Sequence, residues 1–234
     1  MIRALVFDFD GLILDTETSV YEAWRNVYAE HDQVLPMDRW LMRIGTDGSA
    51  FDPMVELRAR VDEALDEEQI QRRRMAFHRT QIAKLDQMPG VRACLEYARA
   101  ESIGTSIASS SSSDWVNGHL ERLGLAHFFD QVVTAEQVDA AKPAPDLYLR
   151  ATELLGVDPS DAIALEDSPN GVQAAKAAGL FCVAVPGPMT RTLSFEAADV
   201  ILRSLDARPA GEWIAQAVAT RPARRDEQPI SPCR

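Results

Sequence analysis

Short runs of apolar residues recur along this chain of 234 residues, and each run is four or five residues long. They read ALVF (4–7), TSIA (105–108), QVVT (131–134), AIAL (162–165) and FCVAV (181–185), with a weaker candidate, DVIL, at 199–202. The apolar positions mostly follow one another instead of alternating with polar ones. This pattern is typical of strands that are buried on both faces, and it predicts one parallel sheet.

Amphipathic stretches with a helical period separate these runs. Each stretch ends at or near a glycine, where the left-handed residue that closes a helix is expected. The stretches are ACLEYARAESIG, WVNGHLERLGL, APDLYLRATELLG and PNGVQAAKAAG, and the glycines are Gly104, Gly124, Gly156 and Gly179. Strands and helices that alternate at these lengths predict an α/β fold with an open, doubly wound parallel sheet of the Rossmann-like kind.

Residues 16–84 contain no convincing strand, and we expect them to form helices inserted after the first strand. The stretch SVYEAWRNVYAEH carries apolar side chains on one helical face, namely Val20, Trp24, Val27 and Tyr28. Ser19 and Glu22 have the spacing of a capping box at the start of that helix. We expect Trp24 and Trp40 to fill a separate core within the insertion.

These patterns predict two domains and a tail. Residues 1–15 and 86–220 are expected to form the Rossmann-like core, and residues 16–85 an inserted α-helical cap. The last segment, RPARRDEQPISPCR (221–234), is polar and rich in proline and arginine, so we expect it to be disordered.

The net charge of −12 narrows the range of partners. Nucleic acids and anionic membranes are bound by basic surfaces, so this charge argues against both. No stretch approaches the roughly 18 apolar residues of a membrane helix. The three cysteines, Cys94, Cys182 and Cys233, lack the spacing of a metal site. They are typical of reduced thiols, and we expect a cytoplasmic protein.

Polar side chains follow the predicted strands at the points where the strands end. In chain order they are Asp8 and Asp10, the serine run at 109–113, Lys142 somewhat downstream of the third run, and the pair Glu166 and Asp167. Ligands of doubly wound sheets bind beyond the carboxyl ends of the strands. We therefore expect these residues to meet at one site.

This combination of carboxylates, hydroxyls and a lysine fits phosphoryl transfer. An ionised Asp8 could attack phosphorus, which divides one difficult step into two. Asp10 is placed to protonate the leaving oxygen and then to activate water, because neighbouring carboxylates move each other's pKa values apart. Mg²⁺ prefers carboxylate and carbonyl oxygens, so Asp8 and Asp167, with the backbone carbonyl of Asp10, could hold it. Glu166 could be a further ligand or could hold a metal-bound water.

The phosphate of a substrate needs hydrogen-bond donors and positive charge. Ser109 could hold the phosphoryl oxygens with nearby backbone N–H groups, Ser110 could add a contact, and Lys142 could offset the negative charge. We expect residues 111–113 to be helix-capping or surface serines instead. The basic run RRR at 72–74 is expected to be a solvated helix face, although one of its arginines could reach a substrate anion.

Four segments of the chain, in this order, resemble the four motifs of the haloacid dehalogenase superfamily. They are DFDGLILDTE, IASSS, KPAPDLYL and LEDSPNG. The inserted helices are similar to the small helical cap of the branch that contains β-phosphoglucomutases and phosphoglycolate phosphatases. The resemblance implies Asp8 as nucleophile and Asp10 as acid/base. It also implies Ser109 and Lys142 as phosphate-site residues, and Asp8, Asp10 and Asp167 as Mg²⁺ ligands.

The resemblance covers residues 4 to about 187 and points to a Mg²⁺-dependent phosphomonoesterase. Dehalogenases of the superfamily lack the second aspartate, which is present here as Asp10. The phosphonatase branch needs a cap lysine, and the cap has none before Lys84. β-Phosphoglucomutases carry a histidine near the position of Val20, and its absence here argues against a phosphohexose mutase, which we keep as the alternative. A non-catalytic binding protein on the same scaffold is the second alternative.

The cap is expected to close over the core and choose the substrate. Its loop RIGTDGSAFDP (43–53) is polar and rich in glycine, and we expect Arg43, Gly45 and Thr46 to face the site. An enclosed pocket suits a small phosphorylated metabolite, such as a sugar phosphate or phosphoglycolate. Many proteins of this kind are monomers, and we expect the same here.

Overall fold

A computed structural model describes residues 1–44 and 50–220 of the chain. Its centre is one sheet of six parallel strands in the order β3-β2-β1-β4-β5-β6. The strands are β1 (Ala4–Phe7), β2 (Gly104–Ala108), β3 (Gln131–Val133), β4 (Ala162–Glu166), β5 (Phe181–Ala184) and β6 (Val200–Ile201). All six predicted runs form strands, so the prediction of a parallel, doubly wound sheet is confirmed.

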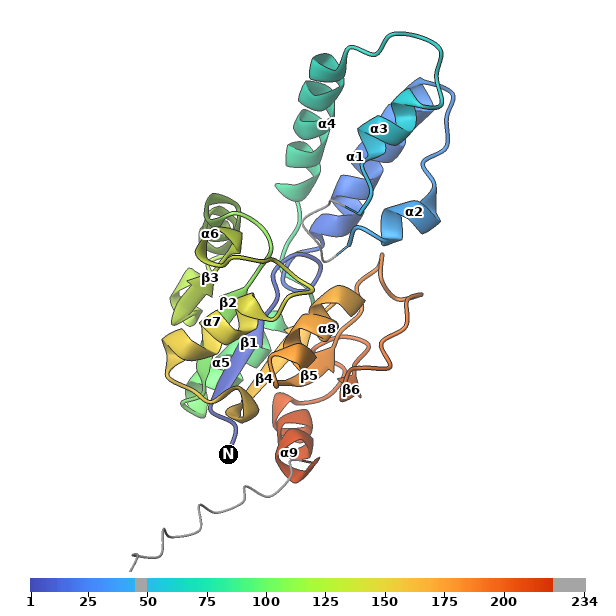
Figure 1. Ribbon diagram of the computed structural model, residues 1–234. Helices are drawn as coiled ribbons and strands as arrows, with labels where there is room; N and C mark the ends of the chain where they lie inside the picture. The colour runs from blue at the N-terminus through green and yellow to red at the C-terminus, as the bar shows by residue number, and fades with distance from the viewer. Residues whose placement is uncertain (45–49, 221–234) are drawn as a thin grey trace, which may run out of the picture.

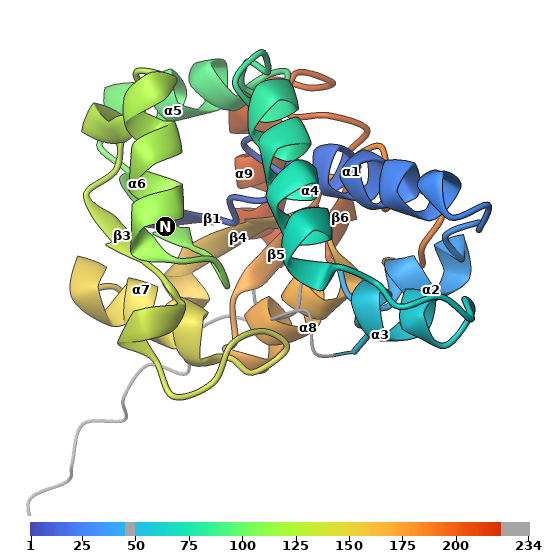
Figure 2. The same cartoon turned by 90° about the horizontal axis from the view of Figure 1, so that it is seen from above.

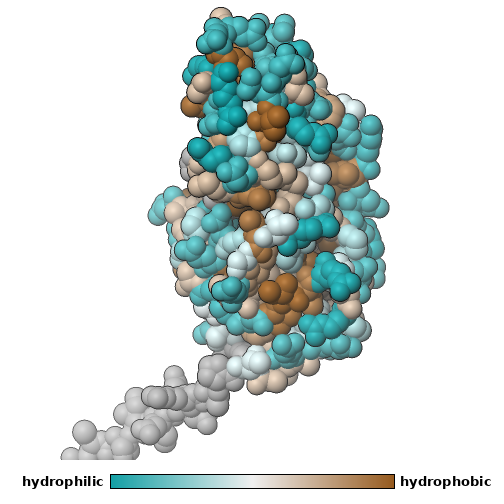
Figure 3. Space-filling view, turned by 90° about the vertical axis from the view of Figure 1, so that its right-hand side faces the viewer, coloured by the Kyte–Doolittle hydropathy of each residue, from teal (hydrophilic) through white to brown (hydrophobic). Residues whose placement is uncertain are grey.

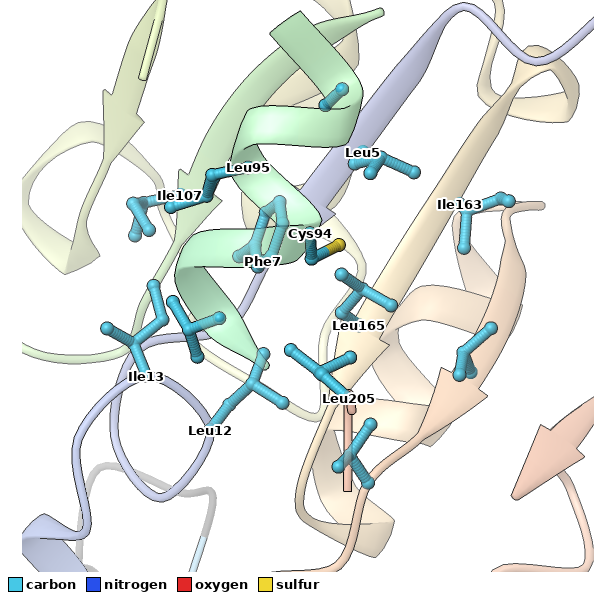
Figure 4. Packing of buried hydrophobic residues seen from close by; sticks show 14 of the residues in the cluster. Leu5, Phe7, Leu12, Ile13, Cys94, Leu95, Ile107, Ile163, Leu165 and Leu205 are labelled. Atoms are coloured by element: carbon cyan, nitrogen blue, oxygen red, sulfur yellow. The ribbon is translucent and has the colours of Figure 1, made fainter. Parts of the chain in front are cut away.

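Helices cover both faces of the sheet, as Figures 1 and 2 show. They are α5 (Val91–Ala100), α6 (Ser113–Arg122), α7 (Asp146–Leu155), α8 (Pro169–Ala177) and α9 (Ala210–Thr220), with short 3-10 helices at Ala126–Phe128, Ala135–Gln137 and Pro159–Asp161. Successive residues of β1 enter different cores because side chains alternate across a strand. Leu5 and Phe7 pack with Leu95 of α5 on one face (Figure 4), whereas Val6 packs with Leu147 of α7 on the other.

Four helices follow β1 before the chain returns to the sheet. They are α1 (Thr16–Glu30), α2 (Met37–Leu41), α3 (Pro53–Arg58) and α4 (Glu67–Ile82). In Figure 1 they stand as a group beyond the end of the sheet at which β1 leads into α1. A separate cluster of buried side chains holds them together, and Trp24 and Trp40 belong to it, as predicted.

Two local predictions about helix ends are wrong. The first inserted helix begins at Thr16, where the Asp15 side chain accepts a hydrogen bond from the backbone N–H of Thr18 at 3.2 Å. Ser19 therefore lies inside the helix and does not cap it. Gly104 is the first residue of β2, and the left-handed residue after α5 is Ser102, with a φ of 54°. The cause is that α5 ends two residues earlier than the glycine pattern suggests.

The boundaries at residues 15/16 and 85/86 fall in the connections on either side of α1–α4. The division into core and cap stays a prediction, and the expected disordered tail at 221–234 lies outside the described residues. Within the described ranges, no helix combines the length and the apolar character needed to cross a membrane. On the face seen in Figure 3, hydrophobic residues form small patches between hydrophilic ones.

Candidate active site

The predicted site residues come from neighbouring strands of the sheet. β1 pairs with β2 on one side and with β4 on the other, with Phe7 opposite Ile107 and Leu165. Because these strands are parallel, the residues that follow them lie at one edge of the sheet. The residues placed there are Asp8 and Asp10 after β1, Ser109 after β2, and Glu166 and Asp167 at the end of β4.

Three buried carboxylates form the centre of this site. Asp8, Glu166 and Asp167 each offer one oxygen, and these atoms lie within 4.8 Å of one another. Burial raises the pKa of Asp8 to about 8, against the opposing effect of the Lys142 charge. Burial, followed by the charges of Asp8 and Glu166, also holds the pKa of Asp167 well above its usual range. A cluster with this much negative charge needs a cation to remain ionised.

Lys142 provides one positive charge. Its ammonium contacts the Asp8 carboxylate and lies 2.6 Å from an oxygen of Glu166. Burial alone would lower the pKa of Lys142, but the charges of Asp8 and Glu166 outweigh burial and raise the pKa above its ordinary value. Lys142 is therefore held in its charged form against the two carboxylates.

Glu166 has both carboxylate oxygens occupied by donors. One oxygen accepts hydrogen bonds from Lys142 and, at 2.8 Å, from the hydroxyl of Tyr148. The other accepts from the backbone N–H groups of Asp167 and Ser168 and from the Ser168 hydroxyl. Sequence reasoning missed Tyr148, which lies in α7 and has the pattern of a core aromatic residue. Glu166 thus orients Lys142 and the turn that carries Asp167.

Two glycines allow these carboxylates to approach the backbone closely. A Cβ atom on Gly11, whose φ is +91°, would lie 2.1 Å from an oxygen of Asp167. A Cβ atom on Gly171 in α8 would lie 1.8 Å from an oxygen of Glu166. Real Cβ atoms do not come so close to other heavy atoms, so both positions need glycine for the carboxylates to occupy their places.

The Asp10 side chain is held apart from the three-carboxylate cluster. One oxygen accepts a hydrogen bond from the Ser111 hydroxyl at 2.6 Å and, at 3.5 Å, from Ser109. The other accepts from the indole N–H of Trp115 at 2.9 Å. The prediction that Ser111 is a capping or surface residue is wrong, because the loop after β2 turns its hydroxyl towards Asp10. Ser112 does cap α6, as predicted.

The residues predicted to contact the substrate lie in different surroundings. Ser109 is buried, and its oxygen accepts from the backbone N–H of Ser111. Ser110 has a buried hydroxyl without a hydrogen-bond partner among the described residues. Gly45 and Thr46 lie outside the described residues. Arg43 lies over the ring of Trp40, 4.7 Å from its centre.

Sequence reasoning also missed Glu17, in the first turn of α1. Loss of solvent around its carboxyl raises the pKa of Glu17 to about 8, and the charge of Asp10 acts in the same direction while Arg43 opposes it. Glu17 is therefore close to both the acid/base candidate and the inserted helices. The only sequence signal for a role of Glu17 was its position at the end of the first motif, two residues after Asp15.

The three arginines at 72–74 have different surroundings. Arg72 pairs with Glu68, and Arg73 pairs with Glu30 at 3.1 Å, and all four side chains are largely solvent-accessible. The guanidinium of Arg74 lies 5.1 Å from the centre of the Trp24 ring. Burial lowers its pKa, and the charge of Arg43 adds to this effect.

Known proteins resemble this chain over most of its length. The profile of the family described as haloacid dehalogenase-like hydrolase matches residues 5–185. YhcW of Bacillus subtilis, provisionally named a phosphatase, is 43% identical over 88% of this chain and 93% of its own. Fructose-1-phosphate phosphatase YqaB of Escherichia coli is 34% identical over 77% of this chain and 95% of its own.

A solved structure shows the same arrangement of elements. It is a Thermotoga maritima protein provisionally named a beta-phosphoglucomutase, with a TM-score of 0.72 and 27% identity. The match covers 92% of this chain and 99% of that one. The similarity thus includes the inserted helices as well as the sheet.

Proposed function

The chain belongs to the haloacid dehalogenase-like hydrolase family, and on that premise we propose that it is a Mg²⁺-dependent phosphatase that forms an aspartyl-phosphate on Asp8. The family and the phosphatase relatives support hydrolysis of phosphorylated metabolites. The observation that carries the proposal is the contact of Asp8 with the buried Lys142 ammonium inside the carboxylate cluster. The positive charge of Lys142 favours the ionised form of this buried carboxylate, which is the form that can act as a nucleophile.

Asp8 begins the reaction. Its carboxylate oxygen forms a bond to phosphorus while the bond from phosphorus to the ester oxygen breaks. The Lys142 ammonium favours the ionised form of Asp8 and offsets negative charge that gathers on the phosphoryl oxygens. Ser109, at the end of β2, is proposed to donate to those oxygens, and Ser110 has the buried hydroxyl that could do the same.

Asp10 handles the protons. Its carboxyl group gives a proton to the ester oxygen as that oxygen leaves. The resulting carboxylate then takes a proton from the water that attacks the aspartyl-phosphate, which returns both aspartates to their starting states. Asp10 suits this role because it follows Asp8 by two residues and is held apart from the carboxylate cluster by Ser111 and Trp115.

The carboxylate cluster fits a magnesium ion. It offers only hard oxygen donors, and burial together with the neighbouring negative charges raises the pKa values of Asp8 and Asp167, an effect that a bound cation would oppose. We place Asp8, Asp167 and the backbone carbonyl of Asp10 as ligands, with Glu166 behind them as a further carboxylate. When bound, Mg²⁺ would supply positive charge that lowers the repulsion between the nucleophile and the phosphate.

A small sugar phosphate is the proposed class of substrate. YqaB, which this chain matches over 95% of the length of YqaB, is named for such a compound, fructose 1-phosphate. Arg43, with Gly45 and Thr46 in the same segment, is proposed to contact the part of the substrate beyond the phosphate. A mutase acting on hexose phosphates is the second candidate, since the Thermotoga maritima structure carries the name of such an enzyme.

Two further parts of the proposal concern the setting of the enzyme. Cys94 and Cys182 are buried free thiols, which suits a reducing cytoplasm. The acidic net charge of −12 supports a protein that binds neither nucleic acid nor membrane and works as a monomer on a small metabolite.

The test is an assay of phosphate release from a panel of sugar phosphates and phosphoglycolate, with and without Mg²⁺. We expect release that depends on Mg²⁺ and falls at least about a thousandfold in Asp8→Asn. Asp114→Asn, which alters an exposed carboxylate on α6, is the matched control and should leave the rate unchanged. Isomerisation of a hexose phosphate that needs a bisphosphate activator, without net release, would favour the mutase. A wild type that does neither reaction would favour a binding protein.

A further inference from the structure

Trp115 of α6 joins the acid/base candidate to the inserted helices. Its indole N–H donates to one oxygen of Asp10 at 2.9 Å. On its face, the ring of His78 from α4 stacks at 5.5 Å between ring centres, with 17° between the planes. The ring of His119 meets it edge-on at 4.4 Å. One side chain thus contacts both Asp10 and a helix of the insertion.

His78 is itself fixed within the insertion. Its Nδ1 atom lies 2.9 Å from the hydroxyl of Ser19 on α1, and both side chains are buried. Through this contact, the ring that stacks on Trp115 is tied to the two longest inserted helices. The position of these helices over the sheet is therefore linked to the ring that holds Asp10.

We propose that Trp115 is a positioning residue for Asp10, and that its indole sets the direction in which the Asp10 carboxyl points. This inference rests on the proposed function, because it concerns the proton that Asp10 gives to the leaving oxygen. It also assigns to the stacking with His78 the task of keeping the indole in place when α4 lies over the site.

The chemistry of the indole explains why a tryptophan suits this position. The indole N–H is a donor only, so it can neither accept a proton nor turn round as a hydroxyl can. The oxygen of Asp10 that faces it, Oδ1, must remain an acceptor. The other oxygen, Oδ2, accepts from the Ser111 hydroxyl at 2.6 Å and from Ser109 at 3.5 Å, so donors on both sides fix the plane of the carboxyl.

Trp115→Phe is the variant that tests this role. It keeps an aromatic ring against His78 and His119, but it removes the N–H donor and one ring of the indole. We would follow single-turnover release of the alcohol from two esters. One is an alkyl phosphate, whose leaving oxygen needs a proton, and the other is p-nitrophenyl phosphate, whose leaving group departs without one.

The expected result is a difference between the two esters. Alcohol release from the alkyl phosphate should fall about tenfold or more, a part of the 10²–10⁴ that a positioned acid contributes. Release of p-nitrophenol should change less than about twofold. A general loss of structure would lower both rates together. Equal rates in variant and wild type for the alkyl ester would overturn the inference while leaving the phosphatase proposal intact.

A second measurement needs no activity. The chain has 4 tryptophans, so an NMR spectrum of protein with ¹⁵N-labelled indoles should show a peak for each, and Trp115→Phe assigns one of them. We expect that peak to move upfield in Asp10→Asn while the other indole peaks stay in place. If the chemical shift of the Trp115 peak is the same in Asp10→Asn as in wild type, the contact between Trp115 and Asp10 is overturned. A wild type inactive on both esters would overturn the proposed function, and the inference about its acid with it.

Discussion

The Lys142 ammonium lies 2.6 Å from a carboxylate oxygen of Glu166, and neither side chain is more than 1% exposed. An ion pair shielded from water in this way is costly to break, because removing one partner leaves the other charge buried and uncompensated. The same ammonium also contacts Asp8. The pair therefore links the stability of the core to the charge state of the proposed nucleophile.

Lys142→Met should lower the free energy of unfolding by about 3–5 kcal/mol, because two buried carboxylates lose their shared partner. Urea unfolding monitored by circular dichroism measures this loss. The matched control is Lys176→Met, which removes the partly exposed pair with Asp199 and should cost no more than about 1 kcal/mol. A loss of similar size in both variants would contradict the special place given to Lys142.

Gly171→Ala should destabilise the protein and impair the site, because the new methyl group would lie 1.8 Å from an oxygen of Glu166. Moving Glu166 would disturb its contacts with Lys142 and Tyr148, so we expect a loss of about 2–4 kcal/mol and of most of the activity.

Gly118→Ala is the matched control, because Gly118 also lies in a helix but has no heavy atom within 4 Å of the added Cβ. In a helix interior alanine is favoured over glycine, so this variant should gain up to about 1 kcal/mol. Thermal unfolding of the two variants beside the wild type gives the comparison. An equal change in stability in the two variants would contradict the conflict between the added methyl group and Glu166.

Mg²⁺ should stabilise the protein more at pH 8 than at pH 6. Burial and like charges raise the pKa of Asp8 from 3.8 to about 8 and raise that of Asp167 as well. For groups with raised pKa values, the stability they contribute without metal is complete below their unfolded pKa and is lost as pH rises through the folded one. Mg²⁺ binds the ionised carboxylates, so its binding is stronger at pH 8 and restores the stability that is lost there without metal.

Thermal shifts with and without Mg²⁺ at the two pH values measure this effect. At a concentration about 100 times the Kd, the added stability should be about 2.7 kcal/mol. Asp167→Asn should abolish most of the shift, whereas Asp114→Asn, on the surface of α6, should retain it. A shift in wild type that is the same at pH 6 and pH 8 would argue against binding at these carboxylates.

The sheet could be predicted because its strands are buried on both faces. Residues such as Ala4 to Phe7 are apolar without interruption, and the polar residues that follow them stand at strand ends, where neighbours in a parallel sheet meet. This is why Asp8 and Asp167 could be assigned to one place from the sequence, whereas the assignment of Lys142, well beyond the end of β3, depended largely on the family resemblance.

The residues that support the site could not be predicted in the same way. Tyr148 and Trp115 have the sequence pattern of core aromatics, and their polar atoms find partners only through the rotation of α7 and α6 against the sheet. Ser111 differs from its serine neighbours only in the direction in which the loop turns it. Such directions depend on tertiary packing, which local sequence patterns do not contain.

His78 gives a last prediction, on stability in acid. Burial, followed by the charge of Arg74, lowers the pKa of His78 from 6.5 to about 4, against the opposing effect of Asp10, while His119 adds to the lowering. The unfolded chain therefore binds a proton at this residue between pH 6.5 and 4, and the folded protein does not. The contribution to stability is complete above pH 6.5 and is lost as pH falls to about 4.

His78→Phe keeps a ring for stacking on Trp115 but cannot titrate. Urea unfolding at a series of pH values should show that stability falls less steeply from pH 6.5 to 4 in this variant than in wild type, by up to about 3 kcal/mol over the window. The variant also loses the contact with Ser19, which shifts its stability at every pH but does not change the slope. His127→Phe alters an exposed histidine and should keep the wild-type slope. Equal slopes in His78→Phe and wild type would contradict the burial of the His78 ring between α4 and Trp115.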